Sequence, residues 1–149
     1  SLIMLIQMLA NTGINIVPLL EMLGNTITVI SDTVTQMYQY SDNNNPDNKL
    51  KGIVYAPNLE TVESRSIDDN SGMTTIIMPK VKTIKSQGFW ASYGLKTVFI
   101  PNACTSLATN AFSVCGNLTN IYIDNVEGTF GDIAADSSLP NLKVTYLKK

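Results

Sequence analysis

The stretch LKTVFIPNACTSLATNAFSVCGNLTNIYID, residues 95–124, decides the fold because it holds one complete structural unit and the start of the next. It begins with a leucine and continues into a short run in which apolar residues alternate. After 23 residues, at Leu118, a leucine and a second run of the same kind appear. Alternation with a period of two is typical of a strand with one buried face. A strand that returns after a fixed interval predicts a repeat protein.

The same unit recurs on both sides of this stretch. The strand-like runs read LKGIVYAP, MTTIIMPK, LKTVFIPN, LTNIYIDN and LKVTYLKK. They begin at Leu50, Met73, Leu95, Leu118 and Leu142, at intervals of 22 to 24 residues. We expect one apolar pair in each run to face the core. The pairs are Ile53 with Tyr55, Ile76 with Met78, Val98 with Ile100, Ile121 with Ile123 and, slipped by one residue, Val144 with Tyr146.

Two further apolar anchors follow the strand within a unit. After a short polar stretch, the first anchor turns the chain back toward the core at Thr61-Val62, Thr83-Ile84 and Ser106-Leu107. The second anchor, at Ile67, Phe89-Trp90 and Ala111-Phe112, precedes residues that tolerate tight turns. One unit cannot bury these side chains alone, whereas stacked copies can. The sequence therefore predicts a β-rich solenoid. Its strands, near 53–55, 76–78, 98–100, 121–123 and 144–147, would form one parallel ladder.

The unit at Leu95 resembles the BspA-type leucine-rich repeat, which reads roughly as a Leu, an Ile-x-Ile-Pro strand, a Thr-Ser-Ile segment, and Ala-Phe followed by Cys. Residues 50–149 resemble an array of such repeats, with the best match over 95–123 and a departure where Asp124 replaces the proline. The resemblance implies a right-handed leucine-rich-repeat coil without a shared catalytic set. It also implies a secreted or cell-surface protein of bacteria or some protists, often an adhesin, or a phage protein.

Residues 1–40 read mainly as a helical segment. Apolar residues recur every seven positions, while glycines and a proline interrupt the pattern, so we expect short helices at about 2–10 and 18–23. This segment would act either as a cap over the repeats or as an oligomerisation segment. Residues 25–40 also fit a degenerate first repeat. Polar interruptions and the lack of a basic flank argue against a transmembrane segment or a secretory signal.

Residues 41–49 read as a linker rich in asparagine and aspartate. Asp42, Asn44 and Asp47 could in principle offer oxygen ligands to calcium. The EF-hand spacing and its terminal glutamate are missing, so a solvated loop is the favoured interpretation. We therefore expect no metal or cofactor site.

Composition narrows the function classes. The chain is 44% hydrophobic with mean hydropathy +0.10, which allows a sizeable core. Its net charge is -2 and its pI is near 4.9, so we expect no broad positive surface that would attract the phosphates of nucleic acid. It has no histidine, which removes the Ser-His-Asp and Cys-His arrangements and most catalytic zinc sites. Cys104 and Cys115 form no CxxC pair and read as buried apolar fillers. No catalytic residue is predicted, and we expect no enzyme.

The candidate partner-binding residues form the column that faces away from the predicted core: Val54, Ile77, Phe99 and Tyr122, followed by Thr145. An exposed apolar stripe commonly marks a protein–protein site. The alternatives are that residues 1–40 cover the stripe or that both faces of the sheet belong to the core. The sequence favours a non-catalytic, secreted or cell-surface module that binds a protein partner or a host surface. The alternative is a structural component of a larger assembly, such as a phage particle or fibre, with a homo-oligomer formed through residues 1–40.

Overall fold

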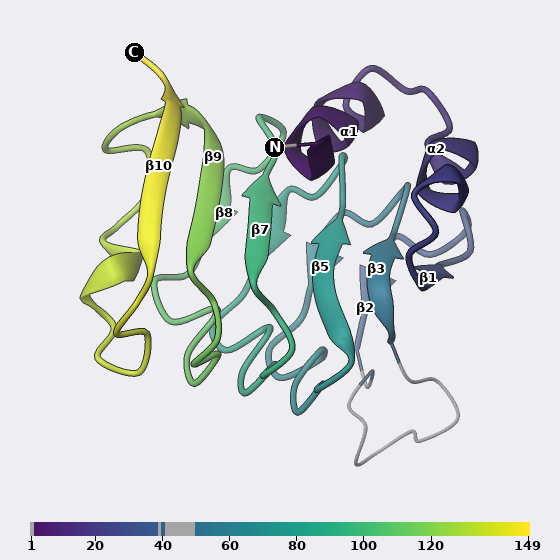
Figure 1. Cartoon of the computed structure of the whole chain (residues 1–149). Helices are drawn as coiled ribbons and strands as arrows, with labels where there is room; N and C mark the ends of the chain where they lie inside the picture. Colours follow the sequence, from purple (N-terminus) through teal and green to yellow (C-terminus); the bar gives the residue numbers. More distant parts are fainter. Residues whose placement is uncertain (1, 39, 41–49) are drawn as a thin grey trace.

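The computed structural model describes residues 2–38, 40 and 50–149. The expected linker at 41–49 lies outside the described residues. Within them the chain winds into a solenoid whose coils stack next to one another, with one strand of each coil on the same face (Figure 1). We call this face the main sheet. Its strands are β1 (Ile27–Val29), β3 (Gly52–Tyr55), β5 (Met73–Ile77), β7 (Thr97–Ile100), β9 (Asn120–Val126) and β10 (Lys143–Lys148).

The five expected strands are confirmed, and every pairing among them is parallel. They do not form a single continuous ladder. β1, β3 and β5 form one three-stranded group, and β7, β9 and β10 form another. β5 and β7 lie side by side, joined by a hydrogen bond from the Lys96 N–H to the Thr74 carbonyl of 3.0 Å. Thr74 is the extra residue where the β3–β5 register shifts. A bulge of this kind bends a strand and disrupts its ladder, which accounts for the division.

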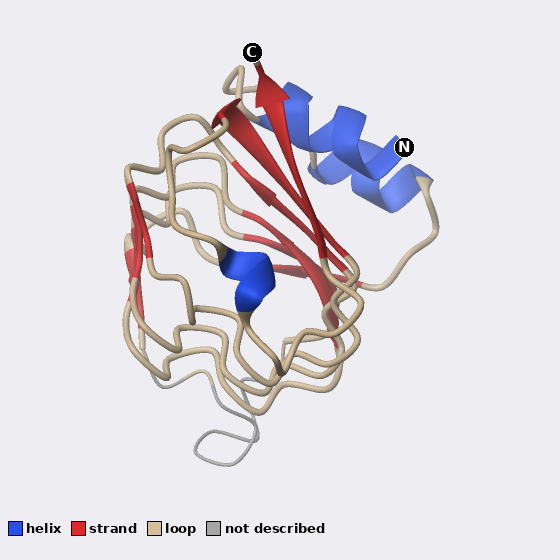
Figure 2. Ribbon diagram, turned by 90° about the vertical axis from the view of Figure 1, so that its left-hand side faces the viewer, coloured by secondary structure: helices blue, strands red, loops and turns tan. Residues whose placement is uncertain are grey.

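A second ladder lies on the opposite side of the coils (Figure 2). Its two-residue strands are β2 (Gln36–Met37), β4 (Thr61–Val62), β6 (Thr83–Ile84) and β8 (Ser106–Leu107). Three of these strands are the first apolar anchors of the sequence, which we expected to turn the chain back toward the core, and their pairing into a ladder was not foreseen. They pair because stacking places equivalent residues of adjacent coils in register, while the second residue of each strand is buried.

The core fills the space between the two ladders. Phe89 and Phe112 are fully buried and stack with their ring centroids 5.0 Å apart and their planes 10° from parallel. Cys104 and Cys115 are free and buried, which confirms their expected role as apolar fillers. Burial raises the pKa of the Cys104 thiol to about 11 and that of the Cys115 thiol to about 12, so both stay protonated at neutral pH.

The register expected for the unit at Leu50 is wrong by one residue. Val54 is fully buried in the core between the ladders, whereas Ile53 and Tyr55 point to the outer side of the main sheet. The cause lies at Gly52, which has a φ of +65° and precedes the register shift between β3 and β5. A side chain there would collide with the Thr26 carbonyl, so only glycine permits this close approach.

The two expected N-terminal helices are confirmed as α1 (Leu2–Ala10) and α2 (Val17–Met22), and a short 3-10 helix, η2, spans Ile133–Ala135. Figures 1 and 2 show α1 and α2 on the outer side of the main sheet. β1 pairs with β3 and β2 pairs with β4, so residues 27–37 form a first repeat and do not extend the helical segment. This decides between the two alternatives left open for residues 25–40. No helix in the described part of the chain is long and apolar enough to cross a bilayer.

Candidate functional site

The outer side of the main sheet presents one residue per strand at the same level. Tyr55 pairs with Ile77, and Phe99 pairs with Tyr122, which in turn pairs with Thr145. Four of the five positions expected from the sequence therefore lie on this side. Val54 does not, because the register shift after Gly52 puts Tyr55 in its place.

The first half of this outer side is covered by the chain itself. Ile53, Tyr55 and Ile77 are buried, with exposed fractions of 6% or less. The helices contribute Ile6, Ala10 and Leu20 to the same apolar cluster, and Ile16, which directly precedes α2, joins them. Desolvation in this cluster raises the pKa of the Tyr55 hydroxyl. The helical segment thus shields the apolar outer residues of β3 and β5 from solvent.

The second half of the outer side is open, since α1 and α2 lie away from β9 and β10 (Figure 1). Phe99 is only 2% exposed and ends the buried part. Tyr122 and Thr145 beyond it are half-buried. We define the open face as the outward residues of these two strands: Asn120, Tyr122, Asp124, Lys143 and Thr145.

The open face combines one aromatic ring with charged groups of both signs. Asp124 is half-buried and Lys143 is exposed. The Lys148 ammonium lies 3.7 Å from a carboxylate oxygen of Asp124, an exposed pair of little energetic value. Asn120, Asp124 and Lys143 were not expected from the sequence, because the expected column holds only one position of each strand. The same alternation, carried two residues to either side of Tyr122 and of Thr145, would have found them.

The outer side of the second ladder differs from the open face. It is lined by exposed ion pairs that join adjacent coils, with 2.6 Å between Lys82 and Glu60 and 2.7 Å between Lys85 and Glu63. The hydrogen bonds and charge of these lysines lower the pKa of both glutamates. The arrangement is that of a solvated surface, and such pairs add little stability.

Asp136, near the C-terminal coils, accepts three hydrogen bonds from two serines. Burial alone would raise its pKa, but hydrogen bonds from the Ser113 hydroxyl at 2.5 Å and from Ser138 lower it overall. Asp136 therefore joins two coils as an anion. Among the described residues, no three His, Cys, Asp or Glu side chains are grouped so that they could hold a metal ion.

Comparison with known proteins gives one match. The model of the BspA type leucine rich repeat region matches six copies across residues 25–145. No curated protein and no solved structure matches the sequence. The six copies correspond in number to the six strands of the main sheet, β1 included.

Proposed function

Because the chain belongs to the BspA-type leucine-rich repeat family, we propose that it is a non-catalytic module that binds another protein through the open face. Arrays of this family are in general non-catalytic scaffolds, and leucine-rich repeats generally mediate protein interactions. Proteins with BspA-type repeats are typically secreted or displayed on the cell surface. The proposed role is adhesion from such a location, with a protein of a host or neighbouring cell as the partner.

The observation that carries the proposal is the unequal covering of the main sheet. The chain's own helices bury the outer residues of β3 and β5, while those of β9 and β10 stay accessible. Tyrosine is enriched at the centres of protein interfaces because its ring buries a large area and its hydroxyl can still bond. Tyr122, flanked by Asp124 and Lys143, offers this combination of aromatic area and polar rim.

Two serine variants on the same side of the sheet test the proposal. Tyr122→Ser should remove the retention of protein-coated beads on intact target cells while changing the free energy of unfolding by about 1 kcal/mol or less. Ile77→Ser is the matched variant under the helices. It should cost roughly 3 kcal/mol or more and release residues 2–22 to limited proteolysis.

The variant on the open half should lose bead retention, and the variant on the covered half should lose stability. A Tyr122→Ser protein that loses stability but keeps full bead retention would contradict a binding role for the open face. A stable Ile77→Ser protein would contradict the covering of the first half.

One observation favours a second candidate function, as a structural component of a larger assembly such as a phage particle or fibre. The outward side of α1 is apolar: Leu2, Leu5 and Met8 are 57%, 54% and 50% exposed and lie three residues apart, on one side of the helix. A homo-oligomer formed through α1 would bury them. Sedimentation measures the solution mass directly. A trimer or larger particle that Leu5→Glu dissociates would favour the assembly role, and a monomer would favour the binding module.

A further inference from the structure

Three lysines lie at the end of the main sheet where its strands begin, which is the lower end in Figure 1. Lys51 directly precedes β3, Lys96 directly precedes β7, and Lys143 is the first residue of β10. The Lys96 N–H donates to the Thr74 carbonyl at 3.0 Å, and the Thr119 N–H donates to the Lys96 carbonyl at 3.0 Å. The Lys143 N–H donates to the Thr119 carbonyl at 2.9 Å, so these residues stack in successive coils. We call Lys51, Lys96 and Lys143 the lysine edge.

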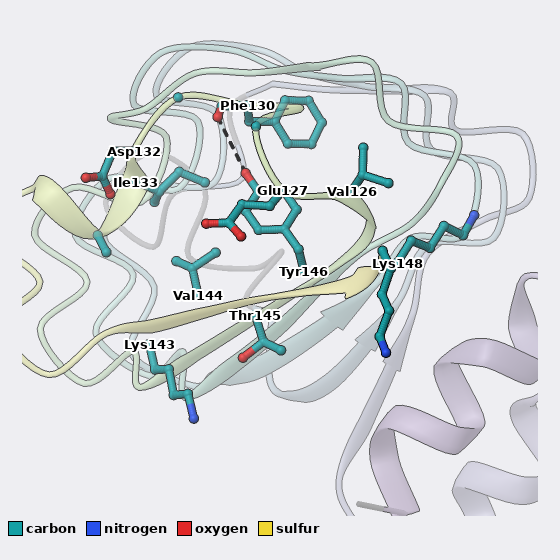
Figure 3. A pocket seen from close by; sticks show the side chains of 14 residues that line it. Val126, Glu127, Phe130, Asp132, Ile133, Lys143, Val144, Thr145, Tyr146 and Lys148 are labelled. Carbon is teal, nitrogen blue, oxygen red and sulfur yellow. Dashed lines mark hydrogen bonds between the residues drawn. The ribbon is translucent and has the colours of Figure 1, made fainter.

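The lysines of this edge occur in alternate coils, because β5 lies between β3 and β7 and β9 lies between β7 and β10. Adjacent parallel strands are about 4.8 Å apart, so the backbone positions of the lysines recur at intervals of about 10 Å. All three lysines are exposed. Figure 3 shows the Lys143 side chain on the opposite side of β10 from Val144. The edge therefore presents a row of evenly spaced cations.

The charge of the lysine edge is not compensated by nearby acidic groups. Among the residues that the structure describes, none of the ion pairs involves this edge. The stretches that lead into the strands also contain no aspartate or glutamate: residues 50–53, 72–75, 94–97, 117–120 and 141–143. Although the whole chain has a net charge of -2, this end of the sheet is positive and attracts a polyanion.

A recess of about 470 Å³ opens beside the middle lysine of the edge. Its lining includes Lys96, Thr74 and Thr97, with Ile53 as an apolar part of the wall. Thr75 also lines the recess, and its hydroxyl oxygen is buried with no hydrogen-bond partner among the described residues. A buried polar group without a partner costs free energy. A hydroxyl of a ligand in the recess can supply the missing bond once the Thr75 side chain turns toward it.

The spacing of the cations distinguishes among polyanions. Phosphates recur about every 3.4 Å along one nucleic-acid strand, so most of them would meet no lysine. An anionic membrane attracts clusters of about four to eight basic residues, which is more than this edge holds. In a linear polysaccharide with an acid group on every second sugar, the charges recur at an interval close to that of the lysines. The sugar hydroxyls of such a chain also match the threonines between the lysines.

We propose that the lysine edge binds a linear acidic polysaccharide, with an acid group opposite each lysine and a sugar ring in the recess beside Lys96. This ligand goes beyond the proposed function, in which another protein binds the open face. Lys143 is the residue that the two surfaces share.

The test measures the affinity of the full chain for hyaluronan hexasaccharide, which carries a carboxylate on every second sugar. Chitin hexasaccharide is the uncharged control and should bind at least about tenfold more weakly. Lys96→Gln should weaken hyaluronan binding about threefold, and the triple glutamine variant of the lysine edge about thirtyfold, since each exposed charge pair contributes modestly. Affinity should fall roughly fifteenfold between about 50 and about 200 mM sodium chloride, as expected for about three neutralised charges.

A second triple variant provides the matched control. Lys80, Lys82 and Lys85 flank β6 on the second ladder and are also exposed. Their replacement by glutamine removes the same net charge and should change the hyaluronan affinity by no more than about twofold. The thermal midpoints of both triple variants check that each one folds.

Four outcomes would overturn the proposal. The first two are that the unmodified chain does not bind hyaluronan, or that chitin hexasaccharide binds equally well. The third is that the two triple variants lose affinity to the same extent, which would show attraction by net charge alone. The fourth is that oligothymidylate or phosphatidylserine vesicles bind more tightly than hyaluronan, because a nucleic acid or a membrane would then be the better ligand.

Discussion

Replacing Phe112 by alanine probes the stacking of the coils directly. The ring is fully buried and stacks on Phe89 of the preceding coil at 5.0 Å. Phe→Ala substitutions in cores cost about 3–5 kcal/mol, and stacked rings contribute about 0.5–1.5 kcal/mol beyond the area they bury. Because no part of this ring reaches solvent, we expect a loss of about 4 kcal/mol. Against a typical total of about 5–15 kcal/mol, this is a large fraction of the stability.

Urea unfolding measures the effect. With a slope of about 2 kcal/mol per molar urea, a loss of 4 kcal/mol lowers the midpoint by about 2 M. Trp90 is the single tryptophan and follows Phe89 in the chain, so its fluorescence reports on the same stack. Circular dichroism reports on the remaining coils. Each coil packs on its neighbours, so both signals should shift together.

A matched variant and a double-mutant cycle sharpen this prediction. Tyr93→Ala removes an aromatic ring that is 47% exposed and should change the stability by about 0.5 kcal/mol or less. Phe89→Ala combined with Phe112→Ala should show a coupling of about 0.5–1.5 kcal/mol. An unchanged midpoint in Phe112→Ala, or a shift no larger than that of Tyr93→Ala, would refute the stacking of the two coils through these rings.

Two further predictions concern backbone approach and pH. Gly94→Ala would put a Cβ 2.5 Å from the carbonyl oxygens of Ser71 and Met73. The clash should lower the free energy of unfolding by about 1–3 kcal/mol, measured as a lower urea midpoint. An unchanged midpoint would show that the coils can separate freely there. Burial raises the pKa of the Cys104 thiol from 9.0 to about 11 and that of the Cys115 thiol from 9.0 to about 12. Above pH 9 the thiols ionise in the unfolded chain but not in the folded chain, so the stability that the two buried thiols contribute is full below pH 9 and is lost as the pH rises toward their folded-state pKa values. Unfolding measured from pH 8 to pH 10 should show a loss of roughly 1 kcal/mol per thiol per pH unit above 9, smaller in Cys115→Ala, and a flat profile would contradict this.

The strands of the solenoid could be predicted because their alternation is a property of the sequence itself. The unit at Leu95 contains every landmark, and its strand, anchor and buried Phe112 lie where the pattern puts them. The register at Gly52 could not be predicted in the same way. It depends on a positive φ and a bulge, and in VYAP both alternations contain apolar residues, so the pattern fits either register.

The sequence could not decide whether residues 1–40 cover the main sheet, for a similar reason. In α1 the sheet-facing Ile6 and Ala10 and the outward Leu5 and Met8 are all apolar, so hydrophobicity does not tell one side of the helix from the other. The column of outer residues could be predicted from alternation. Which of its members are accessible depends on where two short helices pack, and this is decided by tertiary contacts.

Site-specific photo-crosslinking shows directly whether the open face is the binding surface. The crosslinker p-benzoylphenylalanine would replace Tyr122 on the open face or, as the matched position, exposed Ser106 on the second ladder, and each protein would be irradiated on intact target cells. We expect one discrete adduct from position 122 that excess unmodified chain competes away, and none from position 106. Equal adducts from both positions, or an adduct from position 106 alone, would contradict it.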